Sequence, residues 1–252
     1  TTQCRGKLPL PRTVLGGPPA VSDHQVCARW DGRERCLRPG IDQVRPTPFV
    51  ELAHGAGAPC GRDSTGAVFC FYGQTESDAE LRQVELPHPA VRVVADAFRE
   101  YALLDDGTLV TWDPYEAMFR SPRVTEVDRG VVEIDGTYLW TCWRSAEAVS
   151  CRGEGKARRI RGMTRPEQLT VGRKHACALE DGIPWCWGDS AFGQLGRRRS
   201  SREVAVAIEG IESAASIDAG DDHTCVLLRE SGDLSCWGRN QAGQVAGVFP
   251  SR

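Results

Sequence analysis

Short apolar runs recur along the chain, and each is followed by a polar turn and by two further strand-like segments. Residues 91–94, 131–134 and 169–171 are three of these leading runs, and they are rich in Val, Ile and Leu. β-Branched residues favour the extended backbone of a strand. No stretch keeps the 3.6-residue spacing of an amphipathic helix, so the pattern predicts an all-β fold.

The two segments after each run are joined by a short polar tip, as in a β-hairpin. An Asp-Gly dipeptide favours a two-residue type I′ turn, and a longer tip often places Gly where the backbone needs a positive φ. Asp-Gly tips occur at 31–32, 106–107 and 181–182, longer tips ending in Gly at 64–66 and 229–232, and a tip without Gly at 146–147. The sequence therefore predicts six hairpins.

Eleven cysteines mark five of these hairpins. After Cys4 they form local pairs separated by 9, 10, 9, 9 and 11 residues, which is too far for the closely spaced ligands of a zinc site. Folding each hairpin about its tip places the two cysteines opposite each other, within reach of a disulfide. The predicted disulfides are Cys27–Cys36, Cys60–Cys70, Cys142–Cys151, Cys177–Cys186 and Cys225–Cys236. The alternative is reduced cysteines that pack as small apolar residues.

The hairpin between Tyr101 and Trp112 has no cysteine. Its Asp-Gly tip predicts that Ala102 faces Thr111, at the place of the missing pair. Both members are missing together, as expected if the other pairs are bonded. Cys4 is predicted to be unpaired within a hairpin, so it is free, bonded elsewhere, or separated from the strand that would precede it.

Several disulfides imply an oxidising compartment, so we expect a secreted, periplasmic or cell-surface protein. The chain starts at Thr1 without a charged and apolar leader, and we expect that an export signal has been removed. No run of about 18 apolar residues occurs, so no membrane span is expected. The 31 Lys and Arg against 34 Asp and Glu give a net charge of −3, which disfavours nucleic acid as a partner.

The hairpins repeat at intervals typical of propeller blades and solenoids. Their first Cys positions, with Ala102 in place of one, stand at 27, 60, 102, 142, 177 and 225. The repeat centres are 27–36, 60–70, 102–111, 142–151, 177–186 and 225–236, and 1–14 is interpreted as a partial repeat. No flexible linker interrupts them, so a single domain over residues 1–252 is predicted.

The last two repeats carry an extended motif. Residues 171–196 read VGRKHACALEDGIPWCWGDSAFGQLG, and 219–247 keep the same order with AGDDHTCVL, SCWG and GQVAG. This order resembles the regulator of chromosome condensation repeat, and the cysteines resemble the secreted bacterial branch of that family. The resemblance implies a β-propeller of four-stranded blades, six or seven in number with seven favoured, whose ring is closed by an N-terminal half-blade.

Histidines and aspartates that recur in the repeats are interpreted as structural. His175 and His223 precede their cysteines by two residues and His24 by three, so they are expected to be structural groups of the repeat that bond to neighbouring backbone. Asp31, Asp106 and Asp181 occupy hairpin tips, where Asp bonds to its own backbone. No Gly-x-Ser-x-Gly elbow occurs. We expect no catalytic residue, no metal site and no cofactor.

We therefore predict an exported, monomeric recognition module, without catalytic activity, that binds a protein or peptide through a propeller face. Enzyme inhibition is one form of that role. Trp and Arg dominate binding hot spots, so the candidate binding residues are Trp30, Trp140, Trp143, Trp185, Arg197, Arg198 and Arg199. The alternatives are ordinary packing for the tryptophans and a solvated loop for the arginines.

Two other functions stay open. An enzyme with an active site in the central channel predicts ionisable groups with perturbed pKa values at one mouth, whereas protein binding predicts a broad patch of Trp, Tyr and Arg. A module that binds glycans or cell-wall fragments would also use exposed Trp.

Overall fold

The computed structural model describes residues 20–22, 25–30, 33–38, 41–45, 49–53, 60–72, 80–117, 121–196 and 201–241. Within these ranges the chain forms strands arranged in six antiparallel sheets, together with one short helix, α1 (Pro114–Ala117). The predicted all-β fold is confirmed. The partial repeat at 1–14 and Cys4 lie outside the described residues, so neither the ring closure nor the number of blades is tested.

Each sheet is a meander in which strand order follows chain order. The first sheet contains β1 (Ala20–Ser22), β2 (Gln25–Trp30), β3 (Arg33–Arg38) and β4 (Ile41–Arg45). The second contains β5 (Glu51–Ala53), β6 (Cys60–Arg62), β7 (Val68–Tyr72) and β8 (Glu80–Val84). The third contains β9 (Ala90–Ala95), β10 (Glu100–Leu104), β11 (Leu109–Trp112) and β12 (Thr125–Asp128).

The other three sheets follow the same plan. The fourth contains β13 (Glu133–Thr137), β14 (Trp140–Arg144), β15 (Val149–Arg152) and β16 (Arg158–Ile160). The fifth contains β17 (Gln168–Val171), β18 (His175–Glu180), β19 (Ile183–Gly188) and β20 (Ser201–Ala207). In the sixth sheet the described strands are β21 (Ala214–Ala219), β22 (His223–Leu228) and β23 (Leu234–Gly238).

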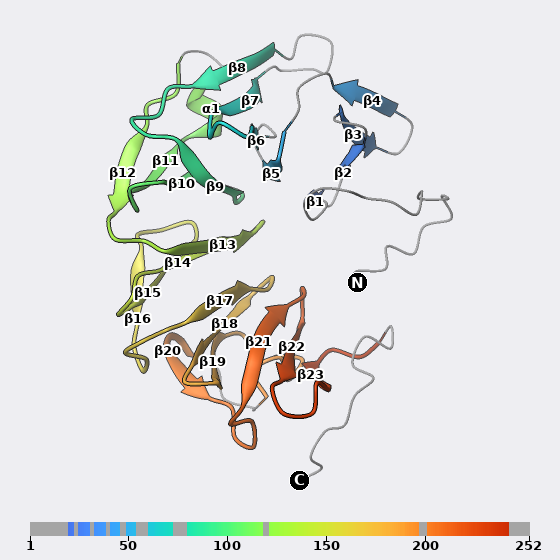
Figure 1. The fold of residues 1–252 in the computed structure, drawn as a ribbon, viewed down its shortest axis with the longest axis vertical. Coiled ribbons are helices and arrows are strands. Elements are labelled where there is room, and N and C mark those ends of the chain that lie inside the picture. The colour runs from blue at the N-terminus through green and yellow to red at the C-terminus, as the bar shows by residue number, and fades with distance from the viewer. Residues whose placement is uncertain are drawn as a thin grey trace.

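The sheets succeed one another around an arc, as blades of a β-propeller do (Figure 1). The first strands of consecutive sheets contact each other, from β5 to β9, β13, β17 and β21. In Figure 1 these strands lie towards the concave side of the arc, whereas β12 and β16 lie on the outside. The inner strands therefore line the centre of the molecule.

The hairpin registers agree with the cysteine spacing. Cys60 faces Cys70, Cys142 faces Cys151, Cys177 faces Cys186 and Cys225 faces Cys236, and each pair is joined by a disulfide. Four of the five predicted disulfides are thus confirmed. Cys27 also faces Cys36 across β2 and β3, but the side chains of these strands are not described, so the fifth bond stays a prediction.

The Asp181-Gly182 tip shows why the dipeptide fixes its hairpin. Both residues have a positive φ, 52° at Asp181 and 76° at Gly182, as a type I′ turn requires. The register consequently runs without a shift from the pair Cys177 and Cys186 to the tip.

The predicted register of the cysteine-free hairpin is wrong by one residue. Ala102 faces Val110, and Thr111 faces Tyr101. The tip is a three-residue loop because the Leu104 amide donates to the Thr108 carbonyl at 2.9 Å, and Gly107 takes the positive φ of 80° within it. No pair of cysteines fixes the register here.

The core lies between neighbouring sheets rather than inside any one of them. Four described clusters of buried apolar residues fill successive interfaces from the second sheet to the sixth. Trp112, Trp187 and Trp237 stand after the second Cys position of their hairpins, and each belongs to one of these clusters. Their predicted packing between blades is confirmed, and it leaves loops and inner strands as the surfaces available for function.

Candidate functional site

The loops between first and second strands form a continuous surface at one end of the sheets. We call this surface the loop face and define it as residues 96–99, 137–140, 172–174 and 220–222. The Ala97 amide donates to the Tyr138 carbonyl at 2.7 Å, and the Arg173 amide donates to the Asp221 carbonyl at 3.0 Å. Each loop is therefore tied to the loop of the next sheet.

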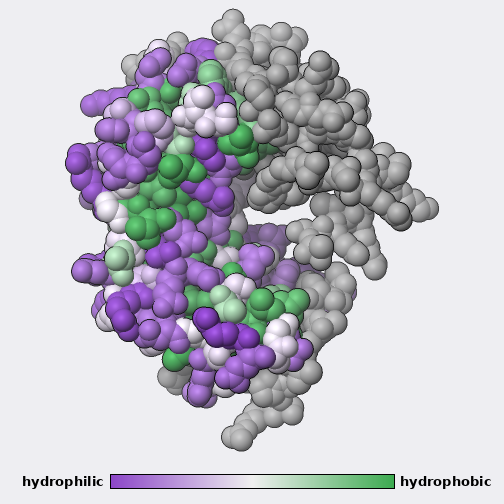
Figure 2. Space-filling view, viewed as in Figure 1, coloured by the Kyte–Doolittle hydropathy of each residue, from purple (hydrophilic) through white to green (hydrophobic). Residues whose placement is uncertain are grey.

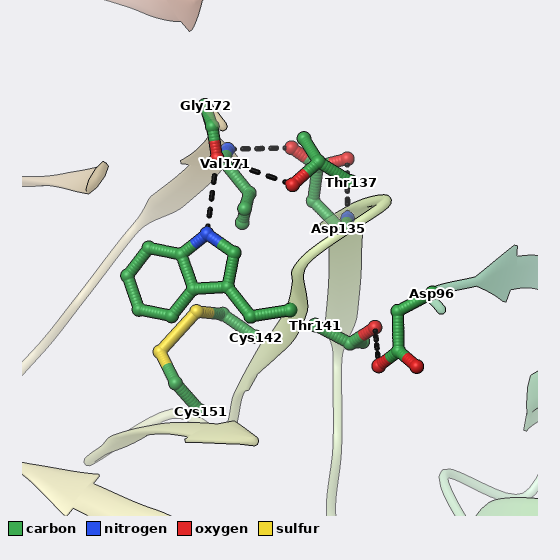
Figure 3. Close-up of a disulfide and its surroundings, with 10 residues drawn as sticks. Asp96, Asp135, Thr137, Thr141, Cys142, Cys151, Val171 and Gly172 are labelled. Atoms are coloured by element: carbon green, nitrogen blue, oxygen red, sulfur yellow. Dashed lines mark hydrogen bonds between the residues drawn. A yellow bond between two sulfur atoms is a disulfide. The ribbon is translucent and has the colours of Figure 1, made fainter. Parts of the chain in front are cut away.

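The fourth sheet is bonded to both neighbours at this end (Figure 3). The Thr141 hydroxyl donates to Asp96 Oδ2 of the third sheet at 3.0 Å. On the other side, Trp140 Nε1 and the Thr137 hydroxyl both donate to the Gly172 carbonyl of the fifth sheet, at 3.0 and 3.2 Å. These bonds hold the loops of three sheets in a fixed relation.

Aromatic side chains stand out from this rigid base. Phe98 and Tyr138 are 36% and 48% exposed, and they lie in the two loops that the Ala97 amide joins. Phe192, in the loop after β19, is also exposed, and the Arg239 guanidinium lies 4.9 Å from the centre of its ring. A cation at this distance from an aromatic face is attracted to it.

A buried carboxylate holds two cations next to this aromatic group. Arg173 Nη2 donates to both oxygens of Asp222, at 3.0 and 2.7 Å, and Arg239 Nη1 donates to Asp222 Oδ2 at 3.3 Å. The two arginines come from the fifth and sixth sheets, while Asp222 is almost fully buried. The result is a fixed arrangement of Arg and aromatic groups, which is the composition of a binding hot spot.

A second feature is a cavity of about 500 Å³ among the inner strands. Figure 2 shows the concave side of the arc as a hollow edged by both hydrophilic and apolar residues. Its apolar wall is formed mainly by Val91, Val132, Leu169 and Ile217, which come from the third, fifth and sixth sheets and from the connection before β13. Cavities of this size and mixed lining are typical of ligand sites.

The charged groups of the cavity are only partly neutralised. Arg92 lines the cavity, and its Nη1 lies 2.9 Å from Glu51 Oε1 of the second sheet. Glu133 also lines it and pairs with Arg144 of the adjacent strand. Each of these charges therefore has an opposite charge beside it.

Asp135 projects from the middle of β13 and accepts two backbone hydrogen bonds. Gly136 N donates to Oδ1 at 2.9 Å, and Val171 N of the fifth sheet donates to Oδ2 at 2.7 Å. The pKa of Asp135 is raised to about 6, mainly by burial and also by the nearby carboxylate of Asp218, although these hydrogen bonds and Arg92 act to lower it. Asp135 forms no ion pair with any residue that the structure describes.

Asp218 belongs to β21 and is more exposed. Its Oδ1 accepts the Ala219 amide at 3.0 Å and the Thr170 hydroxyl at 3.4 Å. Like Asp135, it has no ion-pair partner among the described residues. The cavity thus contains two carboxylates whose charge is stabilised by backbone and hydroxyl groups but is not cancelled.

The cavity lining contains no Ser, Cys or His that could pair as nucleophile and base. Within the described ranges, no group of three or more His, Cys, Asp or Glu could hold a metal ion. The lining offers apolar contact and negative charge, which is chemistry for binding.

His175 has the structural role that its position predicts. Its Nε2 lies 2.8 Å from the Thr224 hydroxyl of the sixth sheet, and Thr224 in turn donates to the Gln194 carbonyl at 3.1 Å. Because the hydroxyl donates to Gln194, we assign the Nε2 hydrogen to His175. Burial lowers the pKa of His175 to about 4, so the imidazole is neutral.

The described tryptophans among the predicted binding residues differ in exposure, and their binding role stays a prediction. Trp143 is 2% exposed, and its Nε1 donates to Asp128 Oδ2 at 2.8 Å. Trp140 and Trp185 are half-buried and pack against the cluster between the fourth and fifth sheets. The Trp30 side chain and Arg197, Arg198 and Arg199 lie outside the description, so their roles stay predictions.

The residues that form the two candidate surfaces escaped the sequence interpretation. Phe98, Tyr138 and Phe192 are not among the predicted binding residues, all of which are Trp or Arg. Their common signal is position, since all three lie in loops at one end of the sheets. Asp135 and Asp218 carry no motif, and only the fold brings them together.

Comparisons with known proteins agree with the repeat pattern. Two profiles of the regulator of chromosome condensation (RCC1) repeat match residues 181–227 and 214–244. RCC1 domain-containing protein 1 of Homo sapiens is 36% identical over 93 residues, which is 35% of this chain and 24% of that protein. The guanine nucleotide exchange factor SRM1 of Saccharomyces cerevisiae is 33% identical over 82 residues, covering 31% of this chain and 17% of its own length. These matches therefore span a quarter or less of the relatives.

Solved structures share the fold over most of the chain. The match with Prp20p of Saccharomyces cerevisiae spans 87% of this chain and 71% of the Prp20p chain, with a TM-score of 0.66 and 12% identity. The match with the ectodomain of the receptor kinase CR4 of Physcomitrella patens spans 79% of this chain and 56% of that ectodomain, with a TM-score of 0.54 and 23% identity. The family models thus identify repeats of the regulator of chromosome condensation type within residues 181–244, and the solved structures show the propeller fold of such repeats over most of the chain.

Proposed function

We propose that this protein is an exported recognition module, without catalytic activity, that binds a protein or peptide partner on its loop face. The observation that carries the proposal is the pair of exposed rings, Phe98 and Tyr138, on loops joined by the hydrogen bond from the Ala97 amide. Rings held on a rigid base lose little conformational entropy when a partner binds.

The basic and aromatic groups beside these rings extend the same surface. Arg239 contacts both Phe192 and Asp222, and Arg173 shares that carboxylate from the neighbouring sheet. Lys174 is exposed in the same loop as Arg173. A patch of aromatic and cationic residues on loops of adjacent sheets suits a partner with apolar and acidic side chains.

The disulfides support the exported part of the proposal. Four disulfides are compatible with an oxidising compartment, where such bonds persist. No helix among the described residues is long and apolar enough to cross a membrane. The CR4 ectodomain, a receptor part by its name, has the same fold. Membership of the secreted bacterial branch and a role as an enzyme inhibitor belong to this proposal as its more specific forms.

The names of the similar proteins describe actions on other proteins. SRM1 is a guanine nucleotide exchange factor, and Prp20p is described with binding to Gsp1p and histones. Nucleotide exchange in the cytosol or nucleus would take place in a reducing environment, where the four disulfides would not persist. We therefore propose the general property, recognition of a protein by a propeller face, and not the exchange reaction.

Selection from a peptide library displayed on phage tests the proposal. Oxidised wild-type protein is immobilised, and selected peptides are measured against the Phe98→Ser/Tyr138→Ser variant by calorimetry. We expect peptides whose affinity falls at least tenfold in the variant, because the exposed rings supply most of the contact.

An Arg229→Ser/Glu230→Ser variant is the matched control, since both side chains are exposed on the hairpin tip of the sixth sheet, at the opposite end from the loop face. It should bind the selected peptides as the wild type does. Thermal unfolding shows whether each variant is folded. Selected peptides that bind all three proteins equally, or that lose affinity only in the control variant, would contradict a binding site on the loop face.

A further inference from the structure

We infer that the cavity among the inner strands is a second binding site, which takes an arginine or lysine side chain presented by a peptide segment of a partner. The site is separate from the loop face and does not depend on the function proposed for it. Three independent features lead to this ligand: the shape of the cavity, its uncompensated charge, and the charge around its mouth.

The shape of the cavity fits a side chain with an aliphatic stem. Val91 and Val132 are 47% and 55% exposed, although both are large apolar residues, and they lie at the beginnings of two inner strands. Leu169 and Ile217 continue this apolar wall inwards. The methylene groups of Arg or Lys pack favourably on such a surface while the charged end remains polar.

The mouth lies at the end of the sheets where the hairpin tips are. The Ala90 amide donates to the Gly66 carbonyl, and the Val131 amide donates to the Gly107 carbonyl, both at 2.9 Å. Each inner strand therefore starts beside the hairpin tip of the preceding sheet, which places Val91 and Val132 at the opening.

The uncompensated charge lies beyond the apolar wall. Glu133 is paired with Arg144, whereas Glu51 is shared by Arg92 and Arg62. Arg92 therefore offsets part of the negative charge of Asp135 and Asp218, and the remaining excess is negative. These two carboxylates lie on either side of β17, and the charge of Asp218 raises the pKa of Asp135. A cation placed between them would relieve their mutual repulsion, and a guanidinium can donate to both.

The surface around the mouth carries the same sign of charge. Exposed carboxylates on the hairpin tips and connections of the third to fifth sheets are Asp105, Asp106, Asp128, Glu147, Glu167 and Asp181. The exposed arginines there are Arg129, Arg161 and Arg165, and two of them pair with acidic neighbours. A basic peptide is therefore attracted to this end of the molecule.

Calorimetric titration with blocked peptides tests the assignment. The probes are acetyl-Gly-Ala-Arg-Ala-Gly-amide, the Lys peptide, and the same peptide with citrulline or norleucine at the centre. We expect saturable binding of the Arg and Lys peptides and at least tenfold weaker binding of the two neutral peptides. Binding of the Arg peptide should weaken as salt is raised from 50 to about 500 mM, because the interaction is between charges.

Two variants locate the site. Asp218→Asn keeps the side-chain oxygen that accepts the Ala219 amide but removes the charge. The affinity for the Arg peptide should therefore fall at least fivefold, while the protein remains folded. Glu154→Gln, an exposed change on the loop between β15 and β16, is the control and should bind as the wild type does.

The pH provides a third readout. Asp135 titrates near pH 6, and the charged groups that face it are Arg92 of β9 and Asp218 of β21, with Glu133 beside it on β13. Between pH 7.5 and pH 5 Asp135 gains a proton and the cavity loses negative charge. Affinity for the Arg peptide should therefore fall at least threefold over this range.

Three results would overturn the inference. One is equal binding of the citrulline and arginine peptides, and another is unchanged affinity in Asp218→Asn. The third is binding of agmatine as tight as that of the peptide, because the cavity would then be a site for free small cations and not for a side chain on a peptide.

Discussion

The Nε2 atom of His175 lies 2.8 Å from the Thr224 hydroxyl, across the interface between the fifth and sixth sheets. Both side chains are fully buried. The histidine therefore connects two blades through a hydrogen bond that its Nε2 donates, and burial keeps the imidazole neutral. A motif residue that could be mistaken for a catalytic or metal-binding group is part of the framework.

The first prediction concerns pH. The pKa of His175 is about 4 in the folded protein and 6.5 when the residue is exposed. Below pH 6.5 the unfolded chain binds a proton that the folded chain does not. The contribution of this residue to stability is therefore lost as pH falls from 6.5 to 4, by about 3 kcal/mol.

Chemical denaturation between pH 4 and pH 8 tests this contribution as a difference between the wild type and His175→Gln. The difference is needed because Asp135, with a raised pKa of about 6, contributes with the opposite sign over nearly the same range. An unchanged slope in His175→Gln would show that His175 is not held neutral.

The second prediction concerns Glu100, which occupies in the third sheet the position that His175 occupies in the fifth. Glu100 is fully buried, and neither carboxylate oxygen has a hydrogen-bond partner. Burial, with the nearby charge of Asp96, raises its pKa well above the usual value. The folded state therefore keeps a proton that the unfolded chain loses, and the free energy of unfolding falls as pH rises above about 4.5.

Glu100→Gln removes this ionisation cost. We expect the variant to be more stable than the wild type at pH 7.5 by about 2 kcal/mol, with the gain shrinking towards pH 4. Thermal and urea unfolding at both pH values measure it. A variant that is less stable than the wild type at pH 7.5 would mean that the carboxylate has a stabilising role.

The third prediction concerns the type I′ turn. Gly182 has a φ of 76°, and a Cβ there would lie 3.3 Å from the Glu212 carbonyl oxygen. Gly182→Ala should cost about 1–2 kcal/mol because alanine rarely adopts this backbone conformation. Gly155→Ala is the control, since nothing lies within 4 Å of its added Cβ. Equal stability of the two variants in urea unfolding would contradict the strained turn.

Local signals predict the hairpins well. The registers at Cys142 and Cys177 follow from spacing and turn chemistry because both partners lie within ten residues of each other. The register at Ala102 is wrong because a loop of two or three residues fits the same Asp-Gly sequence, and no cysteine pair selects between them.

The candidate sites depend on contacts between sheets, which local pattern does not encode. Asp135 and Asp218 are more than eighty residues apart, and the circular order of the inner strands brings them into one cavity. The burial of Trp143 is likewise decided by its neighbours, since an alternating strand has one face towards each adjacent sheet. Residue type alone led to the choice of Trp143 as a candidate binding residue, and contacts between sheets bury its side chain.

The most direct measurement is the mass of the oxidised protein with and without reductant and alkylating agent, followed by mapping of the linked peptides. We predict five bonds, each within one hairpin, including Cys27–Cys36, with Cys4 outside them. This result would confirm the hairpin registers and support an exported recognition module. Free thiols throughout the native protein, or bonds between different sheets, would contradict it.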